Sequence, residues 1–101
     1  MSMLMSVIAR EESRNEKMIS EYTKELGTLA KGKITPKMIN GRRYYYLYYR
    51  DGKKVVSKYI GNDEERLAAV REQLERRRQI EELLKMLKEE RLQIKKLEAS
   101  L

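Results

Sequence analysis

The spacing of hydrophobic and polar residues changes twice along the chain. Residues 1–32 carry apolar side chains at helical spacing, as at Met18, Tyr22 and Leu26. Residues 33–60 are rich in Tyr, Val and Ile, which favour strands. Helical spacing returns after Gly61, and neither Gly nor Pro follows. The pattern predicts an α+β protein: an N-terminal helix, a three-stranded antiparallel β-meander and a long C-terminal helix with coiled-coil character.

The sequence allows two start positions for the first helix. Leu4 and Ile8 extend the apolar face of the helix towards the N-terminus. Ser13 followed by Glu16 forms a capping-box pattern, which would start the helix there instead. Gly27 or Gly32 is expected to end it.

Two tight-turn signals frame the predicted sheet. Asn40-Gly41 and Asp51-Gly52 both favour two-residue type I′ hairpins, because these residue types tolerate positive φ. They separate three extended runs, at 33–39, 42–50 and 53–60. Pro36 is acceptable because its strand lies at an edge of the sheet.

These turns also predict a register. Ile39 should pair with Arg42, and Arg50 with Lys53, which sets Tyr44 opposite Tyr59. Strand alternation then sorts the side chains onto two faces. The aliphatic face collects Ile34, Met38, Leu47, Val56 and Ile60, with Tyr45 and Tyr49. The tyrosine face collects Tyr44, Tyr46, Tyr48 and Tyr59, with Lys33, Lys37, Arg50, Lys53, Thr35 and Ser57.

The C-terminal segment, residues 62–101, is predicted to be one helix with Asn62 as N-cap and Glu65 at N3. Leu67, Val70 and Leu74 form one apolar stripe, which we expect to cover the sheet. A second stripe follows a heptad. Its residues are Ile80, Leu83, Leu87, Ile94, Leu97 and Leu101. This stripe meets either the N-terminal helix, residues 1–32, or a second copy of itself, and we expect a homodimer.

The distribution of charge along the chain indicates a function for residues 31–60. The net charge is +7 over 101 residues. Residues 31–60 hold nine Lys or Arg against Asp51 alone, or +8, and the flanking segments come to −1 and zero. A positive field concentrated on the sheet, residues 33–61, indicates a polyanionic partner, most simply nucleic acid.

Several classes of protein are excluded or disfavoured. There is no Cys and no His, which excludes disulfides and thiolate metal sites and removes the commonest general base. Adjacent glutamates such as Glu81 and Glu82 point about 100° apart on a helix and are not poised for acid–base catalysis. We predict a protein that is not an enzyme, has no cofactor and no membrane span, and is cytoplasmic.

Aromatic rings and cations on one sheet face are typical of nucleic-acid binding, because bases stack on rings while Lys and Arg neutralise phosphates. The alternative is that tyrosine is only a half-exposed strand former. The candidate binding residues are Lys33, Lys37, Arg42, Arg43, Tyr44, Tyr46, Tyr48, Arg50, Lys53 and Tyr59. The run Arg76-Arg77-Arg78 covers three directions around a helix, and we interpret it as a solvated face paired with nearby glutamates.

The segment INGRRYYYLYYRDGKKVVSKYIG resembles the signature of a family of small prokaryotic proteins of unknown function, common on phages and mobile elements. The pattern INGxxYYYLxYRxGxKVxSKYIG falls within residues 37–61, about a quarter of the chain. The hairpin is also similar to the N-terminal strands of some transposases. The resemblance offers no catalytic residues. It implies mobile DNA and the handling of nucleic acid, DNA or RNA, or of nucleoprotein.

That context adds alternatives. A small phage protein can be an anti-CRISPR inhibitor, here one whose basic face grips guide RNA or an acidic surface of a Cas effector. A structural coiled-coil adaptor is a further alternative, against which stands the charge of the sheet segment.

Overall fold

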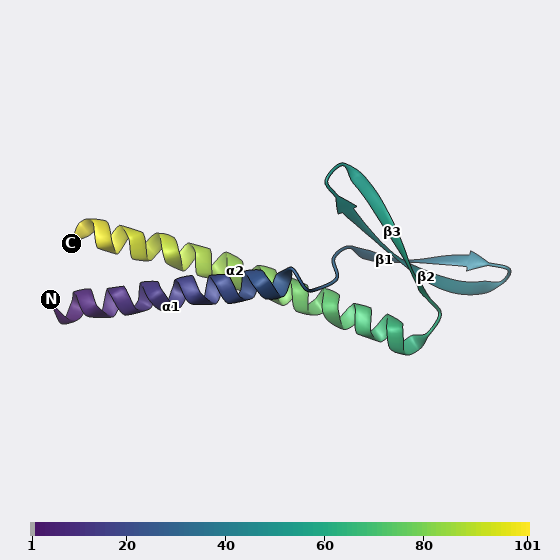
Figure 1. Ribbon diagram of the computed structural model, residues 1–101, viewed down its shortest axis with the longest axis horizontal. Coiled ribbons are helices and arrows are strands. Elements are labelled where there is room, and N and C mark those ends of the chain that lie inside the picture. Colours follow the sequence, from purple (N-terminus) through teal and green to yellow (C-terminus); the bar gives the residue numbers. More distant parts are fainter. Residues whose placement is uncertain (1) are drawn as a thin grey trace. The chain divides into compact units, whose positions relative to one another are not determined.

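The computed structural model describes residues 2–101 and confirms the predicted α+β order (Figure 1). The elements are α1 (Met3–Leu26), β1 (Lys33–Ile39), β2 (Arg42–Asp51), β3 (Lys54–Gly61) and α2 (Glu64–Ser100). They form two compact units. A sheet unit spans Leu29–Arg77, and a helical unit joins Arg78–Leu101 to the chain up to Thr28. Helix α2 therefore contributes to both units. The sequence segments 1–32, 33–61 and 62–101 follow the order of the elements along the chain instead.

Helix α1 begins close to the N-terminus. The Ser2 hydroxyl oxygen accepts a hydrogen bond from the Met5 amide at 3.1 Å, and Ser2 is extended, as an N-cap requires. The alternative start at Ser13 is therefore wrong, since the helix runs through it without a break. Gly27 ends the helix, although its φ of −65° remains right-handed.

The first hairpin of the sheet forms as predicted. Asn40 and Gly41 have φ values of 51° and 77°, the two positive values that a type I′ turn requires. Ile39 pairs with Arg42 and Lys37 with Tyr44. Strand β2 lies in the middle of the sheet, with β1 on one side and β3 on the other (Figure 1).

The second hairpin differs from the prediction by two residues. Asp51 pairs with Lys54, so the central turn residues are Gly52 and Lys53 instead of Asp51 and Gly52. Of these two only Gly52 has positive φ, 65°, which matches a type II′ turn and not type I′. Tyr59 consequently lies opposite Tyr46, not Tyr44. A shift of two residues leaves every β3 side chain on its predicted face, because strand side chains alternate with period two.

The aliphatic face of the sheet carries the core of its unit. Leu47, Ile60 and Leu67 of α2 are buried together, with Leu47 6% exposed. Partly buried apolar side chains pack around them: Ala30, Ile34, Tyr45, Tyr49, Val70 and Leu74. The stripe Leu67, Val70, Leu74 therefore covers the aliphatic face, as predicted. Met38 was assigned to the same face but is exposed, because β1 and β2 extend past the last residue that β3 pairs.

Helix α2 starts one residue later than expected. The Asp63 carboxylate accepts a hydrogen bond from the Glu65 amide at 2.9 Å, which makes Asp63 the N-cap in place of Asn62. The Asp63 carbonyl oxygen accepts from the Leu67 amide and opens the helical ladder. Glu64 and Glu65 then occupy the first turn, where carboxylates are stabilised by the helix dipole.

The segment before β1 is held by side chains of α2. Arg77 donates hydrogen bonds to the carbonyl oxygens of Leu29 and Ala30, at 3.0 and 2.9 Å. Gln73 accepts one from the Ala30 amide. The interpretation of residues 76–78 as a solvated face is therefore wrong for Arg77, which is half-buried and satisfies backbone carbonyls. Gly32 is required here, since its φ is 115° and a Cβ would stand 2.1 Å from the Tyr48 carbonyl oxygen.

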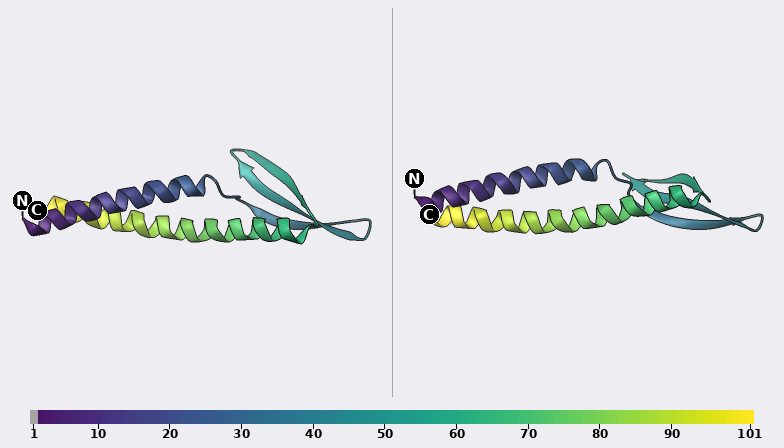
Figure 2. Two further views of the ribbon diagram at one scale, coloured as in Figure 1. Left: turned by 60° about the horizontal axis from the view of Figure 1, so that its bottom comes forward. Right: turned by 90° about the horizontal axis from the view of Figure 1, so that it is seen from below.

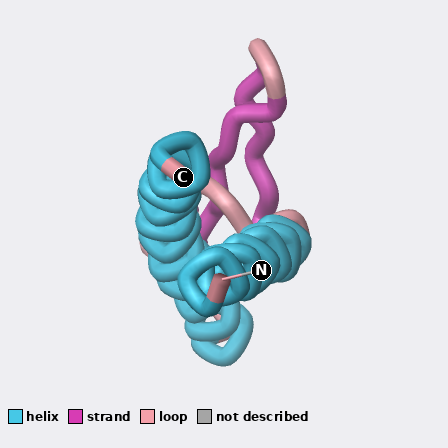
Figure 3. The backbone as a smooth tube through the Cα atoms, turned by 90° about the vertical axis from the view of Figure 1, so that its left-hand side faces the viewer, coloured by secondary structure: helices cyan, strands magenta, loops and turns pink. Residues whose placement is uncertain are grey.

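In the helical unit, α1 and residues 78–100 of α2 lie side by side and antiparallel, so the start of α1 lies near the end of α2 (Figures 2 and 3). Ile8 of α1 and Ile80, Leu84, Leu87 and Ile94 of α2 are buried, Ile80 completely. The residues proposed for oligomerisation therefore differ in how far they are buried. Ile80, Leu87 and Ile94 are buried within one chain, Leu83 is half-buried and Leu97 is exposed. The homodimer stays a prediction, but most of its proposed contact is already covered within the chain.

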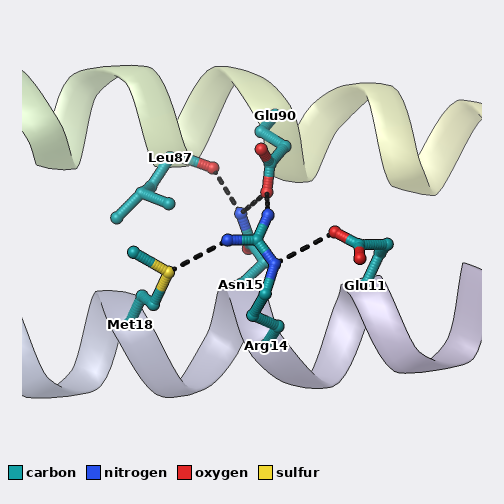
Figure 4. Close-up of polar contacts among 6 residues, drawn as sticks. All are labelled: Glu11, Arg14, Asn15, Met18, Leu87 and Glu90. Atoms are coloured by element: carbon teal, nitrogen blue, oxygen red, sulfur yellow. Dashed lines mark hydrogen bonds and ion pairs between the residues drawn. The ribbon is translucent and has the colours of Figure 1, made fainter.

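A buried asparagine joins the two helices of this unit (Figure 4). Asn15 is completely buried, and its Nδ2 donates to the Leu87 carbonyl oxygen at 2.8 Å and to Glu90 Oε1 at 3.0 Å. Arg14 donates to the same Glu90 oxygen and to Glu11. The Asn15 Oδ1 has no hydrogen-bond partner among residues 2–101.

Candidate functional site

The tyrosine face lies on the opposite side of the sheet from the buried core. Strand alternation sets Tyr44, Tyr46 and Tyr48 of β2 on it, and β3 adds Tyr59. The rings form a connected cluster. Tyr46 and Tyr59 meet edge to face with centroids 5.3 Å apart, and Tyr44 lies 6.3 Å from Tyr59. Tyr46 and Tyr48 are 6.4 Å apart. The three strand β2 tyrosines are half-buried by these contacts, and Tyr59 is 54% exposed.

A lysine from β1 lies over this cluster. Lys37 Nζ is 4.9 Å from the centroid of Tyr46 and 5.8 Å from that of Tyr48, a cation–π arrangement. Hydrogen bonding with the Tyr48 hydroxyl raises the pKa of Lys37. The same hydrogen bond, followed by one with Ser57, lowers the pKa of Tyr48. Lys37 is therefore charged at neutral pH while its ammonium group stays open to solvent.

The remaining predicted binding residues do not all share this face. Lys33 is opposite Tyr48 and Arg50 is opposite Val55, both on the tyrosine face. Arg43 precedes Leu47 by four positions in β2, so both side chains lie on the aliphatic face, Arg43 at its exposed end. Lys53 is a central residue of the second turn and not part of the strand face. Of the predicted binding residues, Arg43 and Lys53 therefore do not belong to the tyrosine face.

The structure adds residues that the sequence interpretation missed. Ile39 and Asn40 join Arg42, Tyr44, Tyr46 and Tyr59 around an open hollow of about 480 Å³. The position of Asn40 in a turn pairing Ile39 with Arg42 was available from the sequence. The hollow was not, because it depends on the two-residue shift that brings Tyr59 opposite Tyr46.

Two further lysines lie over a tyrosine of the aliphatic side. Lys31 Nζ is 5.4 Å and Lys58 Nζ 5.6 Å from the ring centroid of Tyr49. Tyr49 also packs against the core of the sheet unit. Positive charge therefore surrounds the sheet on both sides, whereas the connected ring cluster lies on the tyrosine face alone.

The described part of the chain lacks two other kinds of feature. No group of three or more Asp or Glu side chains in residues 2–101 is placed to hold a metal ion. In the same residues, neither helix is both long and apolar enough to span a membrane.

Fold and surface together define a small α+β protein whose three-stranded sheet buries one side and carries tyrosine rings and cations on the other. The chain belongs to a family described as a domain of unknown function, DUF6788, whose model matches residues 8–69. That range takes in most of α1, the whole sheet and the first turns of α2. No curated protein and no solved structure matches the chain.

Proposed function

We propose that this is a non-enzymatic nucleic-acid-binding protein that uses the tyrosine face. The observation that carries the proposal is the position of the Lys37 ammonium group, 4.9 Å from the centroid of Tyr46, within a connected cluster of tyrosine rings. A cation and an aromatic surface side by side match the two parts of a nucleotide, the phosphate and the base.

The distribution of charge supports the same proposal. Residues 31–60 carry +8 while the chain as a whole carries +7, so the positive field is centred on the sheet. Asp51, the one acidic residue of this segment, lies at the second turn and not among the rings. A polyanion approaching the tyrosine face meets Lys33, Lys37 and Arg42 without a competing carboxylate from the strands.

A matched pair of lysine variants tests this proposal. Lys37→Gln removes a cation from the tyrosine face, and Lys58→Gln removes one from the opposite side of the same sheet. We expect Lys37→Gln to reduce the slope of log affinity against log salt by about 0.7 for single strands or 0.9 for duplex, as one phosphate contact is lost. Lys58→Gln should leave the slope nearly unchanged. Equal slopes for both variants would mean that the tyrosine face does not contact the phosphates.

A protein partner is the second candidate, on one specific observation. Val55 is 62% exposed on the tyrosine face, and Ile39 is exposed at its edge, so apolar side chains accompany the rings. Such a mixture also suits an acidic protein surface, and within the phage or mobile-element context such a partner would be a Cas effector. A stable complex with purified effector that persists after nuclease treatment would favour this inhibitor function over nucleic-acid binding.

A further inference from the structure

The hollow on the tyrosine face has the size and chemistry of a small-molecule site. Its volume of about 480 Å³ falls in the range of about 300–1,000 Å³ typical of ligand pockets. Tyr44, Tyr46 and Tyr59 supply rings, Arg42 a guanidinium group, Asn40 an amide and Ile39 an apolar side. None of these six described residues is acidic, which suits a ligand that combines a planar ring with an anionic group.

The rings around the hollow are held in place before any ligand arrives. Tyr59 contacts Tyr46 edge to face, at an interplanar angle of 63°, and Tyr44 at 35°. Its ring also lies over the backbone of Gly61, where a Cβ would stand 3.4 Å from the Tyr59 hydroxyl oxygen. Because these contacts fix Tyr59, little conformational entropy is lost when a ligand stacks on it.

The spacing of the rings restricts how a base can bind. A base inserted between two rings needs about 3.5–4.0 Å on each of its sides, or roughly 7–8 Å between parallel rings. Tyr44 and Tyr59 are 6.3 Å apart and tilted, so they cannot hold a base between them as they stand. A base therefore stacks on the outer surface of one ring, and Tyr59 is the most exposed of the four tyrosines on this face.

Arg42 and Asn40 complete the match to a nucleotide. A guanidinium group donates two parallel hydrogen bonds to a phosphate, and an amide both donates to and accepts from the edge of a base. Asn40 belongs to the first turn and Arg42 begins the strand beside it, so the type I′ turn fixes the backbone positions from which both side chains extend. The hollow thus offers a stacking surface, a phosphate ligand and an edge-reading group within one cluster.

We infer that this hollow binds one unpaired nucleotide, so that the protein prefers single-stranded nucleic acid to a duplex. A base in a duplex is stacked on both sides and exposes no ring surface, and extruding it costs free energy. In a single strand the same base is free to stack on tyrosine. The inference rests on the proposed function, which by itself distinguishes neither form of nucleic acid.

Binding of three labelled ligands to the full-length protein tests the inference. They are a thymidine strand, an abasic strand and a duplex, each about 20 nucleotides long and so longer than one site. The abasic strand retains every phosphate and lacks every base. We expect the thymidine strand to bind about tenfold more tightly than the abasic strand, the effect of stacking one base. Equal affinity for all three would overturn the inference and leave the proposed function standing. Absence of binding to any of them would overturn both.

Variants of Tyr59 separate stacking from other effects. Tyr59→Leu keeps an apolar side chain and removes the ring, and we expect about a tenfold loss of affinity for the thymidine strand only. Tyr59→Phe keeps the ring and should bind all ligands as the unaltered protein does. Equal losses for the thymidine and abasic strands would show that the ring acts through the fold or the phosphates, which contradicts the inference. Tyr44→Leu provides a second variant in case circular dichroism shows Tyr59→Leu to be unfolded.

Discussion

Tyr59 of β3 meets Tyr46 of β2 edge to face, with their ring centroids 5.3 Å apart. The two residues are directly paired in the sheet, and between Tyr45 and Tyr46 the register shifts, since Tyr45 pairs with Gly61. Strand β3 therefore carries one extra residue at this point, a β-bulge, and bulges re-aim side chains at functional positions. This contact links the middle strand to an edge strand across the tyrosine face.

Substitutions of the neighbours Tyr46 and Leu47 should have different effects, one on nucleic-acid binding and the other on stability. Tyr46→Ala removes ring contacts on the solvent side, which are worth about 0.5–1.5 kcal/mol beyond burial, and should weaken nucleic-acid binding while the protein stays folded. Leu47→Ala leaves a cavity in the core of the sheet unit and should lower the free energy of unfolding by about 2–5 kcal/mol. Urea denaturation and anisotropy titrations of both variants measure the two effects. If Tyr46→Ala proved the more destabilising, the assignment of the faces would be wrong.

The Lys37–Tyr48 pair predicts a specific alkaline titration. Its hydrogen bond lowers the pKa of Tyr48 and raises that of Lys37, so both groups are ionised together only between these two pKa values. The raised pKa of Lys37 stabilises the folded state below the pKa of lysine in the unfolded chain, and this contribution is lost as the pH rises through the folded pKa. The lowered pKa of Tyr48 stabilises the folded state only above the pKa of tyrosine in the unfolded chain. Stability at neutral pH should therefore not respond to the lowered tyrosine pKa.

Lys37→Met should raise the pKa of Tyr48 towards its ordinary value, which NMR of ring-labelled tyrosine can follow residue by residue. Ser57→Ala should produce a smaller upward shift, because Ser57 is the weaker of the two hydrogen-bond partners. A Tyr48 titration unaffected by Lys37→Met would show that the two side chains are not in contact in solution.

The second helical stripe predicts different outcomes for Leu87 and Leu97. Leu87 is 7% exposed within the helical unit, so Leu87→Glu buries an unpaired charge and should unfold that unit. Leu97 is 52% exposed and offers surface for a second copy, so Leu97→Glu should keep the fold and convert the predicted homodimer to a monomer. Circular dichroism and light scattering report the two results. A monomeric mass for the unaltered protein would remove the homodimer altogether.

Asn15 predicts a trade between stability and specificity in the helical unit. Its buried Oδ1 has no partner among the described residues, and leaving such an atom unsatisfied costs about 1–3 kcal/mol. We expect Asn15→Leu to raise the urea midpoint and Asn15→Ala to lower it, since alanine leaves a cavity. Buried asparagines also fix helix register, so Asn15→Leu should give additional NMR signals from alternative pairings. A lowered midpoint for Asn15→Leu would mean that its bonds to Leu87 and Glu90 outweigh the unsatisfied oxygen.

The sequence determined the elements and the faces of the sheet. Side chains in β2 alternate with period two, so Leu47 must lie on the other face of the sheet from Tyr46 and Tyr48, whatever the register. Asn40-Gly41 fixed the first hairpin, because only residues that tolerate positive φ form a type I′ turn. The apolar triplet Leu67, Val70 and Leu74 likewise predicted which part of α2 covers the aliphatic face.

Tertiary structure decided what local signals left open. Asp51-Gly52 allows either of two turns, and cross-strand packing, including the Tyr46–Tyr59 contact, selects Gly52 and Lys53 as the central pair. A heptad stripe is compatible with any apolar partner, so only the three-dimensional structure shows that Ile80 and Leu87 are buried within a single chain. The hollow on the tyrosine face combines residues from three strands with a register shift. Its shape depends on distances that no periodicity in the sequence encodes.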